Sequence, residues 1–129
     1  MMREIKFRAW TDEGMINVTR ITFAGDIVYV MSDNDEHDGY EFQVGVEKLR
    51  QFTGLKDKNG KEIYEGDIVE TVYCFSKPHK GEVYFQPTRL NWSVKHSGFT
   101  NQDLFVYSRP DCSVEVIGNI YENPELLEK

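Results

Sequence analysis

The sequence predicts a mainly β domain. Short runs in which apolar and polar residues alternate recur along the chain, and tight turns rich in Gly, Asn, Asp and Pro separate them. Such alternation is typical of strands with one buried face. The pattern favours a helix at residues 122–129, and it is ambiguous between a strand end and a short helical turn at residues 44–52. With 129 residues, 40% of them hydrophobic, the chain is long enough for a single domain, residues 1–129, with a core of its own.

The first part of the chain, residues 1–46, is predicted to be an N-terminal β subdomain built as a meander. Residues 3–10 alternate as a half-buried strand does. Residues 15–23 predict a strand that breaks near Thr19, and residues 27–31 predict another. Near residue 46, where this subdomain ends, we expect a strand to finish and to be followed by one irregular or helical turn.

An acidic segment occupies residues 32–41. Counted from Asp33, an EF-hand calcium loop requires Gly at the sixth position and Glu at the twelfth. These positions hold Asp38 and Val44, so the motif fails. We expect a solvated loop, and we expect His37 within it to contribute nothing specific to the binding of a metal ion.

The central residues 51–69 are predicted to contain a β-hairpin. A two-residue turn at Asn59 and Gly60 would place like charges opposite each other across the strands, which is unfavourable. A three-residue loop ending at Gly60 instead places Asp57 opposite Lys61. It also suits a type I turn that is followed by a left-handed glycine bulge.

The rest of the chain, residues 47–129, is predicted to form this hairpin and a small antiparallel barrel, whose closure hides strand edges. The segments "EGDIV" and "GEVYF" resemble the opening strands of Src-homology-3-like barrels. Asn123 and Pro124 suit the start of a short C-terminal helix. The barrel strands are expected at residues 67–75, 82–85, 90–96, 104–108 and 113–121.

Side chains with catalytic or metal-binding chemistry are few and scattered. Cys74 and Cys112 form no C-x-x-C pair; Cys74 is expected to pack as a small hydrophobe, and a disulfide between the two stays open. Glu65, Asp67 and Glu70 offer paired carboxylates for acid–base work, but Asp67 is expected to bond the amides of the neighbouring turn. The three histidines are expected at the surface. The sequence therefore predicts no enzyme, no cofactor and no metal ion.

The charge balance restricts the partners. A net charge of −7 disfavours non-specific nucleic-acid binding and anionic membranes, because both require a basic surface. Only residues 74–89 interleave aromatic and basic side chains. The predicted interaction face comprises Lys77, His79, Lys80, Tyr84, Arg89 and Trp92.

Three segments resemble the signatures of YopX-domain proteins, which are small proteins encoded by phages and prophages of bacteria. These segments are "REIKFRAW" at residues 3–10, "FTGLKDKNGKEIYEGDIV" at 52–69 and "EVIGNIYENPELL" at 115–127. The resemblance implies a YopX-like, mainly β fold with a Src-homology-3-like barrel, and a phage or prophage origin. It implies no catalytic or binding residues.

The leading functional hypothesis is a non-enzymatic phage or prophage accessory protein that binds a host or phage protein. The acidic surface favours a basic partner, and exposed strand edges make a homo-oligomer reasonable. No leader-like segment or membrane-length apolar run is found in the sequence, so the host cytoplasm is expected. The alternatives are a weak nucleic-acid-binding module that uses the basic and aromatic face, and a cryptic hydrolase.

Overall fold

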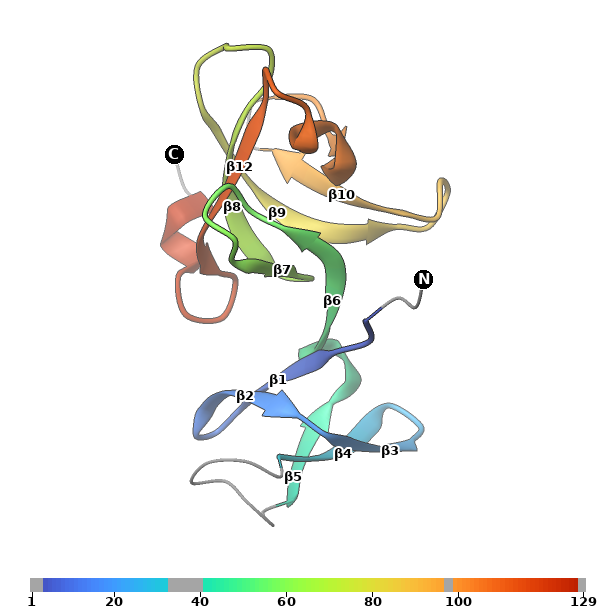
Figure 1. The fold of residues 1–129 in the computed structure, drawn as a ribbon. Helices are drawn as coiled ribbons and strands as arrows, with labels where there is room; N and C mark the ends of the chain where they lie inside the picture. The colour runs from blue at the N-terminus through green and yellow to red at the C-terminus, as the bar shows by residue number, and fades with distance from the viewer. Residues whose placement is uncertain (1–3, 33–40, 97–98, 128–129) are drawn as a thin grey trace. The chain divides into compact units, whose positions relative to one another are not determined.

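A computed structural model describes residues 4–32, 41–96 and 99–127 (Figure 1). The chain forms two compact units, Met1–Phe52 and Thr53–Lys129. Both are built from antiparallel strands, and the helical elements in the described part of the chain are short 3₁₀ turns. The mainly β fold class is therefore confirmed. None of the described helices has the length and apolar character that crossing a membrane requires.

The first unit contains two antiparallel arrangements. Strand β1 pairs with β2 and with the first residues of β6, while β3, β4 and β5 form a three-stranded meander. The predicted break at Thr19 is confirmed, because β2 ends and β3 begins on either side of it. The elements are β1 (Phe7–Thr11), β2 (Gly14–Val18), β3 (Arg20–Ala24), β4 (Ile27–Met31), β5 (Glu41–Gly45), the 3₁₀ turn η2 (Val46–Lys48) and β6 (Leu49–Lys56).

The core of this unit comes from the inward residues of its strands, which alternate with half-buried or exposed ones. It consists of Ala9, Ile16, Val28, Val30 and Val44. Residues 33–40 of the acidic segment, His37 among them, for which a solvated loop was predicted, lie outside the described residues. Glu41, the last residue of that segment, begins β5.

The second unit is dominated by a five-stranded antiparallel sheet in the order β11-β10-β9-β8-β12. Figure 1 shows that β9 and β10 are long and strongly curved. The elements after β6 are β7 (Glu62–Tyr64), β8 (Asp67–Val72), β9 (His79–Gln86), β10 (Asn91–His96), β11 (Gln102–Asp103), the 3₁₀ turn η3 (Leu104–Ser108), β12 (Ser113–Asn119) and the 3₁₀ turn η4 (Pro124–Leu127). The core consists of Ile63, Val69, Val83, Val94, Leu104, Tyr107 and Val114.

The predicted three-residue hairpin loop is confirmed. The Asp57 N–H donates to the Lys61 carbonyl oxygen at 2.8 Å, and the Gly60 N–H donates to the Asp57 carbonyl oxygen at 3.0 Å. Gly60 has φ of +84°, the left-handed conformation that the bulge requires.

Residues 104–108 form the 3₁₀ turn η3, so the strand predicted there was wrong. Asp103 precedes the turn, and its Oδ1 accepts from the Phe105 N–H at 2.9 Å. The Ser108 hydroxyl donates to the Phe105 carbonyl at 2.7 Å. These local bonds offer the backbone an alternative to a strand ladder. At the C-terminus, where a short helix was predicted, Pro124–Leu127 form the 3₁₀ turn η4.

Two predicted strands are shorter than expected, the first at its end and the second at its start, and non-glycine residues with positive φ lie at both points. Strand β8 stops at Val72, and Cys74 and Phe75 follow with φ of +51° and +59°. Cys74 is therefore exposed, and the prediction that it packs as a small hydrophobe was wrong. Leu90, predicted to begin the strand over residues 90–96, precedes β10 with φ of +55° and is 77% exposed.

Candidate binding site

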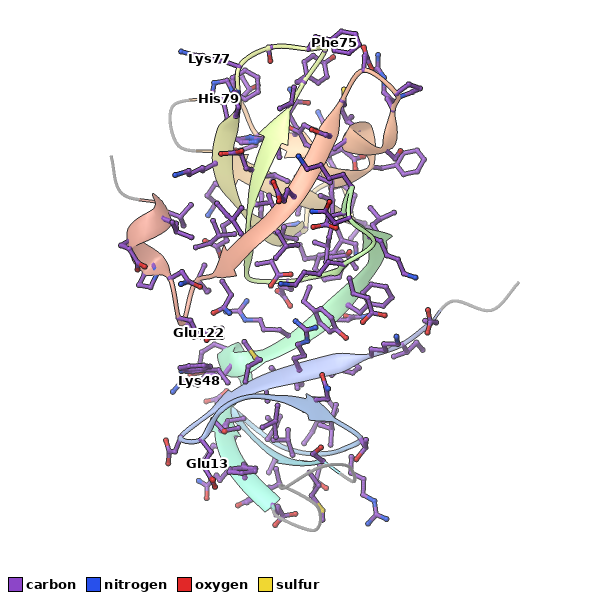
Figure 2. The ribbon with its side chains drawn as sticks, turned by 60° about the vertical axis from the view of Figure 1, so that its left-hand side comes forward. Glu13, Lys48, Phe75, Lys77, His79 and Glu122 are labelled. Carbon is purple, nitrogen blue, oxygen red and sulfur yellow. The ribbon has the colours of Figure 1, made fainter. Side chains whose placement is uncertain are left out.

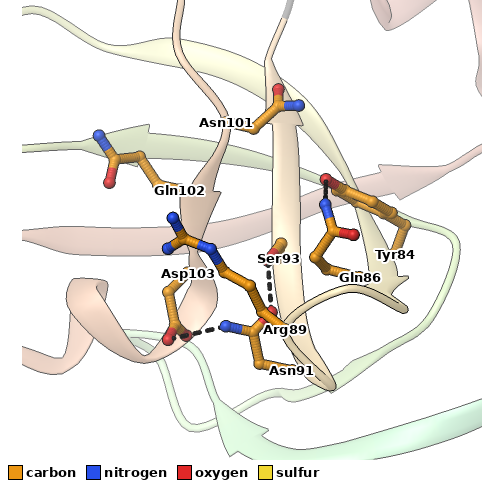
Figure 3. Close-up of a pocket in the computed structure, with 8 residues that line it drawn as sticks. All are labelled: Tyr84, Gln86, Arg89, Asn91, Ser93, Asn101, Gln102 and Asp103. Atoms are coloured by element: carbon orange, nitrogen blue, oxygen red, sulfur yellow. Dashed lines mark hydrogen bonds between the residues drawn. The ribbon is translucent and has the colours of Figure 1, made fainter.

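A polar hollow of about 210 Å³ lies on one face of β9, β10 and β11 (Figure 3). Directly opposed residues of neighbouring strands project to the same face. Because Tyr84 lies opposite Ser93 and Gln86 lies opposite Asn91, these four side chains gather on one side of the sheet. The hollow is lined by Tyr84, Gln86, Arg89, Asn91, Ser93, Asn101, Gln102 and Asp103.

Side-chain hydrogen bonds hold the floor of the hollow in place. The Asn91 amide donates to Asp103 Oδ2 at 3.2 Å, and the Ser93 hydroxyl donates to Asn91 Oδ1 at 2.9 Å. The Gln86 amide donates to the Tyr84 hydroxyl oxygen at 3.1 Å. Interlocked polar side chains are ordered before a ligand arrives, which lowers the entropy cost of binding.

The rim of the hollow carries the groups that remain accessible. Arg89 and Asn101 are exposed and Gln102 is half-buried. Within the described part of the chain, Arg89 forms no ion pair. Asp103 is the one carboxylate among these lining residues, and it already accepts bonds from Asn91 and from the Phe105 N–H. The arrangement therefore offers hydrogen-bond donors and acceptors to a polar ligand, whereas the Asp103 carboxylate has a structural role.

A family model described as YopX protein matches residues 6–128, which include every residue of the hollow. The chain belongs to the YopX family. It is also similar to a solved structure, the crystal structure of protein EF1440 from Enterococcus faecalis, at 33% sequence identity and a TM-score of 0.57. That similarity covers 98% of this chain and 100% of the other. No curated protein matches the sequence.

The structure of this YopX-family chain brings two residues of the predicted interaction face to the hollow, Tyr84 and Arg89. Lys80 shares the face of Tyr84, because strand residues at even spacing project to the same side. Trp92 lies on the opposite face, where its ring contacts Phe85 at 5.3 Å between centroids and it packs against the core.

The two other residues of the predicted face lie away from the hollow. His79 begins β9, and its ring stacks on Phe99 with 4.1 Å between centroids. Lys77 precedes β9 and points away from the ribbon (Figure 2). The predicted face therefore divides between the two surfaces of the sheet and the connection before β9.

His96 is buried, whereas all three histidines were expected at the surface. Its Nδ1 lies 2.9 Å from the Thr100 carbonyl, and its Nε2 lies 2.7 Å from the Thr71 hydroxyl. A carbonyl oxygen only accepts, so we assign the proton of neutral His96 to Nδ1 and the acceptor role to Nε2. Burial lowers the pKa of His96 and outweighs the bond to Thr100, and the nearby His79 lowers it further. Neutral His96 in β10 therefore joins β8 through its hydrogen bond with Thr71.

Asp57 has a structural role that the sequence reasoning missed. Its carboxylate was expected to face Lys61 as a charge partner. Asp57 does lie opposite Lys61 in the hairpin. Its carboxylate is in addition buried, with Oδ1 accepting from the N–H groups of Asn59 and Lys61, and Oδ2 accepting from the Val116 N–H, each at 2.9 Å. Burial by itself would raise the pKa of Asp57, but the three main-chain donors, helped by the charge of Lys61, prevail and lower it from its ordinary value. The Asp at the first turn position was the available signal for the two local bonds.

Asp67 fulfils the structural role predicted for it. Its carboxylate is buried and accepts from the Tyr64 N–H at 2.8 Å across the turn that contains Gly66. Gly66 has φ of +89°. The turn binds this carboxylate as aspartates commonly bind turn amides.

Proposed function

We propose that this YopX-family chain is a non-enzymatic accessory protein of a phage or prophage, which binds an extended polar segment of another protein at the hollow. The observation that supports this most directly is the amide-rich lining. Gln86, Asn91, Asn101 and Gln102 supply both donors and acceptors on one sheet face. Main-chain N–H and C=O groups of an extended peptide need that mixture.

Charge favours a basic protein of the host or the phage as the partner. The net charge of −7 attracts a basic protein at long range and speeds its encounter. At short range, Arg89 on the rim suits a carboxylate of the bound segment. Tyr84 adds a flat surface, and Lys95 Nζ lies 5.1 Å from its ring centroid.

The finer architecture is part of the proposal. We infer that the sheet of the second unit closes as a Src-homology-3-like barrel. The curvature of β9 and β10 in Figure 1 and the register shift in β12 between Val116 and Gly118 support this, because bulges bend strands.

Self-association in the bacterial cytoplasm is also proposed. Strand β11 is an edge strand of the five-stranded sheet, and an edge strand offers main-chain groups with which a second copy could pair.

The binding proposal is tested by photo-crosslinking and pull-down from host cells, with the oligomer size measured in parallel. We expect Arg89→Ala combined with Asn101→Ala to lose a partner that the parent chain captures. The matched control is Arg20→Ala, which removes an exposed arginine from the first unit. Affinity is then measured with the purified partner; equal affinity of all three chains would overturn the placement of the site.

The two alternatives give distinct outcomes. Binding of single-stranded DNA that falls steeply with added salt and weakens in Lys80→Ala would favour the nucleic-acid module. Turnover of a hydrolysable substrate that Asp67→Ala abolishes, in a variant shown to be folded, would favour the hydrolase.

A further inference from the structure

Three side chains with metal-ligand chemistry converge at the end of β8. The donor atoms of Cys74, Asp111 and Cys112 all lie within 4.8 Å of one another. Cys74 and Cys112 are 38 residues apart in sequence, so no spacing motif marks them. Both are free thiols, Cys74 exposed and Cys112 half-buried.

The fold itself brings these residues together. Strands β8 and β12 pair antiparallel with Val72 opposite Ser113, so the residues just beyond each strand end also meet. The Phe75 N–H donates to the Asp111 carbonyl at 3.0 Å, which fixes the two segments against each other. The Cys74 N–H donates to Cys112 Sγ at 3.4 Å.

We propose that Cys74, Asp111 and Cys112 form a site for a borderline or soft divalent cation, with Zn²⁺ as the physiological class. This inference is independent of the proposed binding function. Thiolates select such ions over Mg²⁺ and Ca²⁺, which prefer oxygen ligands. In a tetrahedral zinc site with Zn–S bonds of about 2.3 Å, two sulfurs lie about 3.8 Å apart. The three donor atoms lie within 4.8 Å of one another, a limit that includes this spacing.

The protons and charges of the site balance. In the metal-free chain the Cys112 thiol donates to Asp111 Oδ1 at 3.5 Å. A hydrogen bond from Cys74, together with the one from Cys112, lowers the pKa of Asp111. The cation replaces both thiol protons, which leave to solvent as two M–S bonds form.

Two thiolates and one carboxylate then carry three negative charges. The cation supplies two positive charges, and Arg109 supplies the third, with Nε 3.7 Å from Asp111 Oδ1. Three protein ligands leave a fourth position for water.

The test uses the untagged full chain under a phosphine reductant, with Zn²⁺ binding measured by competition against a chromophoric chelator. Co²⁺ serves as a second probe, because a sulfur-to-cobalt charge-transfer band reports thiolate ligation directly. We expect one ion per chain and the thiolate band. Cys74→Ser or Cys112→Ser should weaken binding by about 100-fold or more, since even indirect partners of metal ligands contribute 10–100-fold.

Asp111→Asn should weaken Zn²⁺ binding by about tenfold or more, since partners of metal ligands contribute 10–100-fold. The sulfur-to-cobalt charge-transfer band should remain, with lower intensity, because both thiolates are still present. Glu125→Gln is the matched control, because it neutralises an exposed carboxylate of η4 in the same unit, and it should bind as the parent does. No stoichiometric binding by the reduced chain would overturn the proposal. So would binding that survives both cysteine substitutions. A reduced chain that binds no Zn²⁺ but oxidises to an intramolecular disulfide would identify a redox pair instead.

Discussion

Two turns of the second unit reverse the chain by different means. The Asp57 hairpin, residues 54–66, places glycine at its left-handed positions, with φ of +88° at Gly54 and +84° at Gly60. The Cys74 loop, residues 73–78, places Cys74 and Phe75 in the same region of backbone space. Non-glycine residues pay a conformational cost there, so contacts from elsewhere must hold the loop.

The hairpin and the loop also differ in where their hydrogen bonds come from. Two of the three bonds to the Asp57 carboxylate lie within the hairpin. In the Cys74 loop, the N–H groups of Cys74 and Phe75 both donate to residues more than 30 positions away, Cys112 and Asp111. Local chemistry specifies the first turn, and strand pairing imposes the second.

The largest expected effect comes from Asp57→Ala, which removes one buried carboxylate and three hydrogen bonds. We expect the free energy of unfolding of the second unit to fall by about 3 kcal/mol, because bonds to charged groups contribute about 1.5–3 kcal/mol each and some donors regain water. Urea unfolding followed by Trp92 fluorescence, in a Trp10→Phe background, measures this unit.

Asp103→Ala is the control for that change, because Asp103 also accepts two bonds but lies outside the hairpin. A loss as large as that of Asp57→Ala would show that Asp57 has no special role. The direction in which the contribution of Asp57 to stability changes with pH also follows from its pKa. Since the pKa of Asp57 is lowered in the folded chain, its contribution is full above the unfolded value of 3.8 and is lost as the pH falls below it.

Gly60→Val is expected to lower the free energy of unfolding by roughly 1 kcal/mol or more, because a β-branched residue resists positive φ. No atom lies within 4 Å of the position that a Cβ would take, so the cost is conformational and not steric. The same urea titration measures it. Gly60→Asn should cost less, since Asn tolerates this region; equal stability of all three chains would contradict the bulge.

Phe75→Gly should do the reverse and raise the free energy of unfolding by about 0.5 kcal/mol. Glycine relieves the left-handed strain, although its greater freedom in the unfolded chain offsets part of the gain. Little burial is lost, because Phe75 is 83% exposed. Phe75→Ala should give no gain in the same assay. A loss of stability in Phe75→Gly would show that the Phe75 side chain contributes contacts to the loop.

The smallest expected effect is on the pH dependence of stability, through His96. Its pKa in the folded chain lies below 6.5, mainly because of burial. The unfolded chain therefore binds the proton first, and the free energy of unfolding falls as the pH drops below about 6.5. Urea titrations from pH 7.5 to 5 should show a shallower dependence in His96→Gln than in the parent. Identical slopes would contradict the buried neutral state.

The sequence predicted the fold where the pattern is local. Alternation placed most of the strands, and charge pairing with turn chemistry placed the loop at Gly60. It failed at residues 104–108, where an apolar run suggested a strand but Asp103 and Ser108 bond the backbone into a 3₁₀ turn. Residue type alone does not distinguish the two.

The candidate binding site was only partly predictable. Tyr84 and Arg89 were identified because aromatic and basic residues alternate there, but Asn91, Asn101 and Asp103 carry no such signal. They meet because β10 pairs with both β9 and β11. Trp92 was placed on the interaction face, whereas its position opposite Phe85 turns it toward the core.

By itself, the sequence determined the β class, the Asp57 hairpin and membership of the YopX family. The first two depend on residues close together in the chain, and the third depends on three separate continuous segments of it. Only the tertiary structure decided which distant residues meet. It buried His96 against Thr71, tied Asp57 to Val116 and brought Cys74 to Asp111 and Cys112. The physical reason is strand register. One hydrogen-bonded ladder aligns side chains dozens of residues apart, and a shift of one residue would turn each of them to the other face.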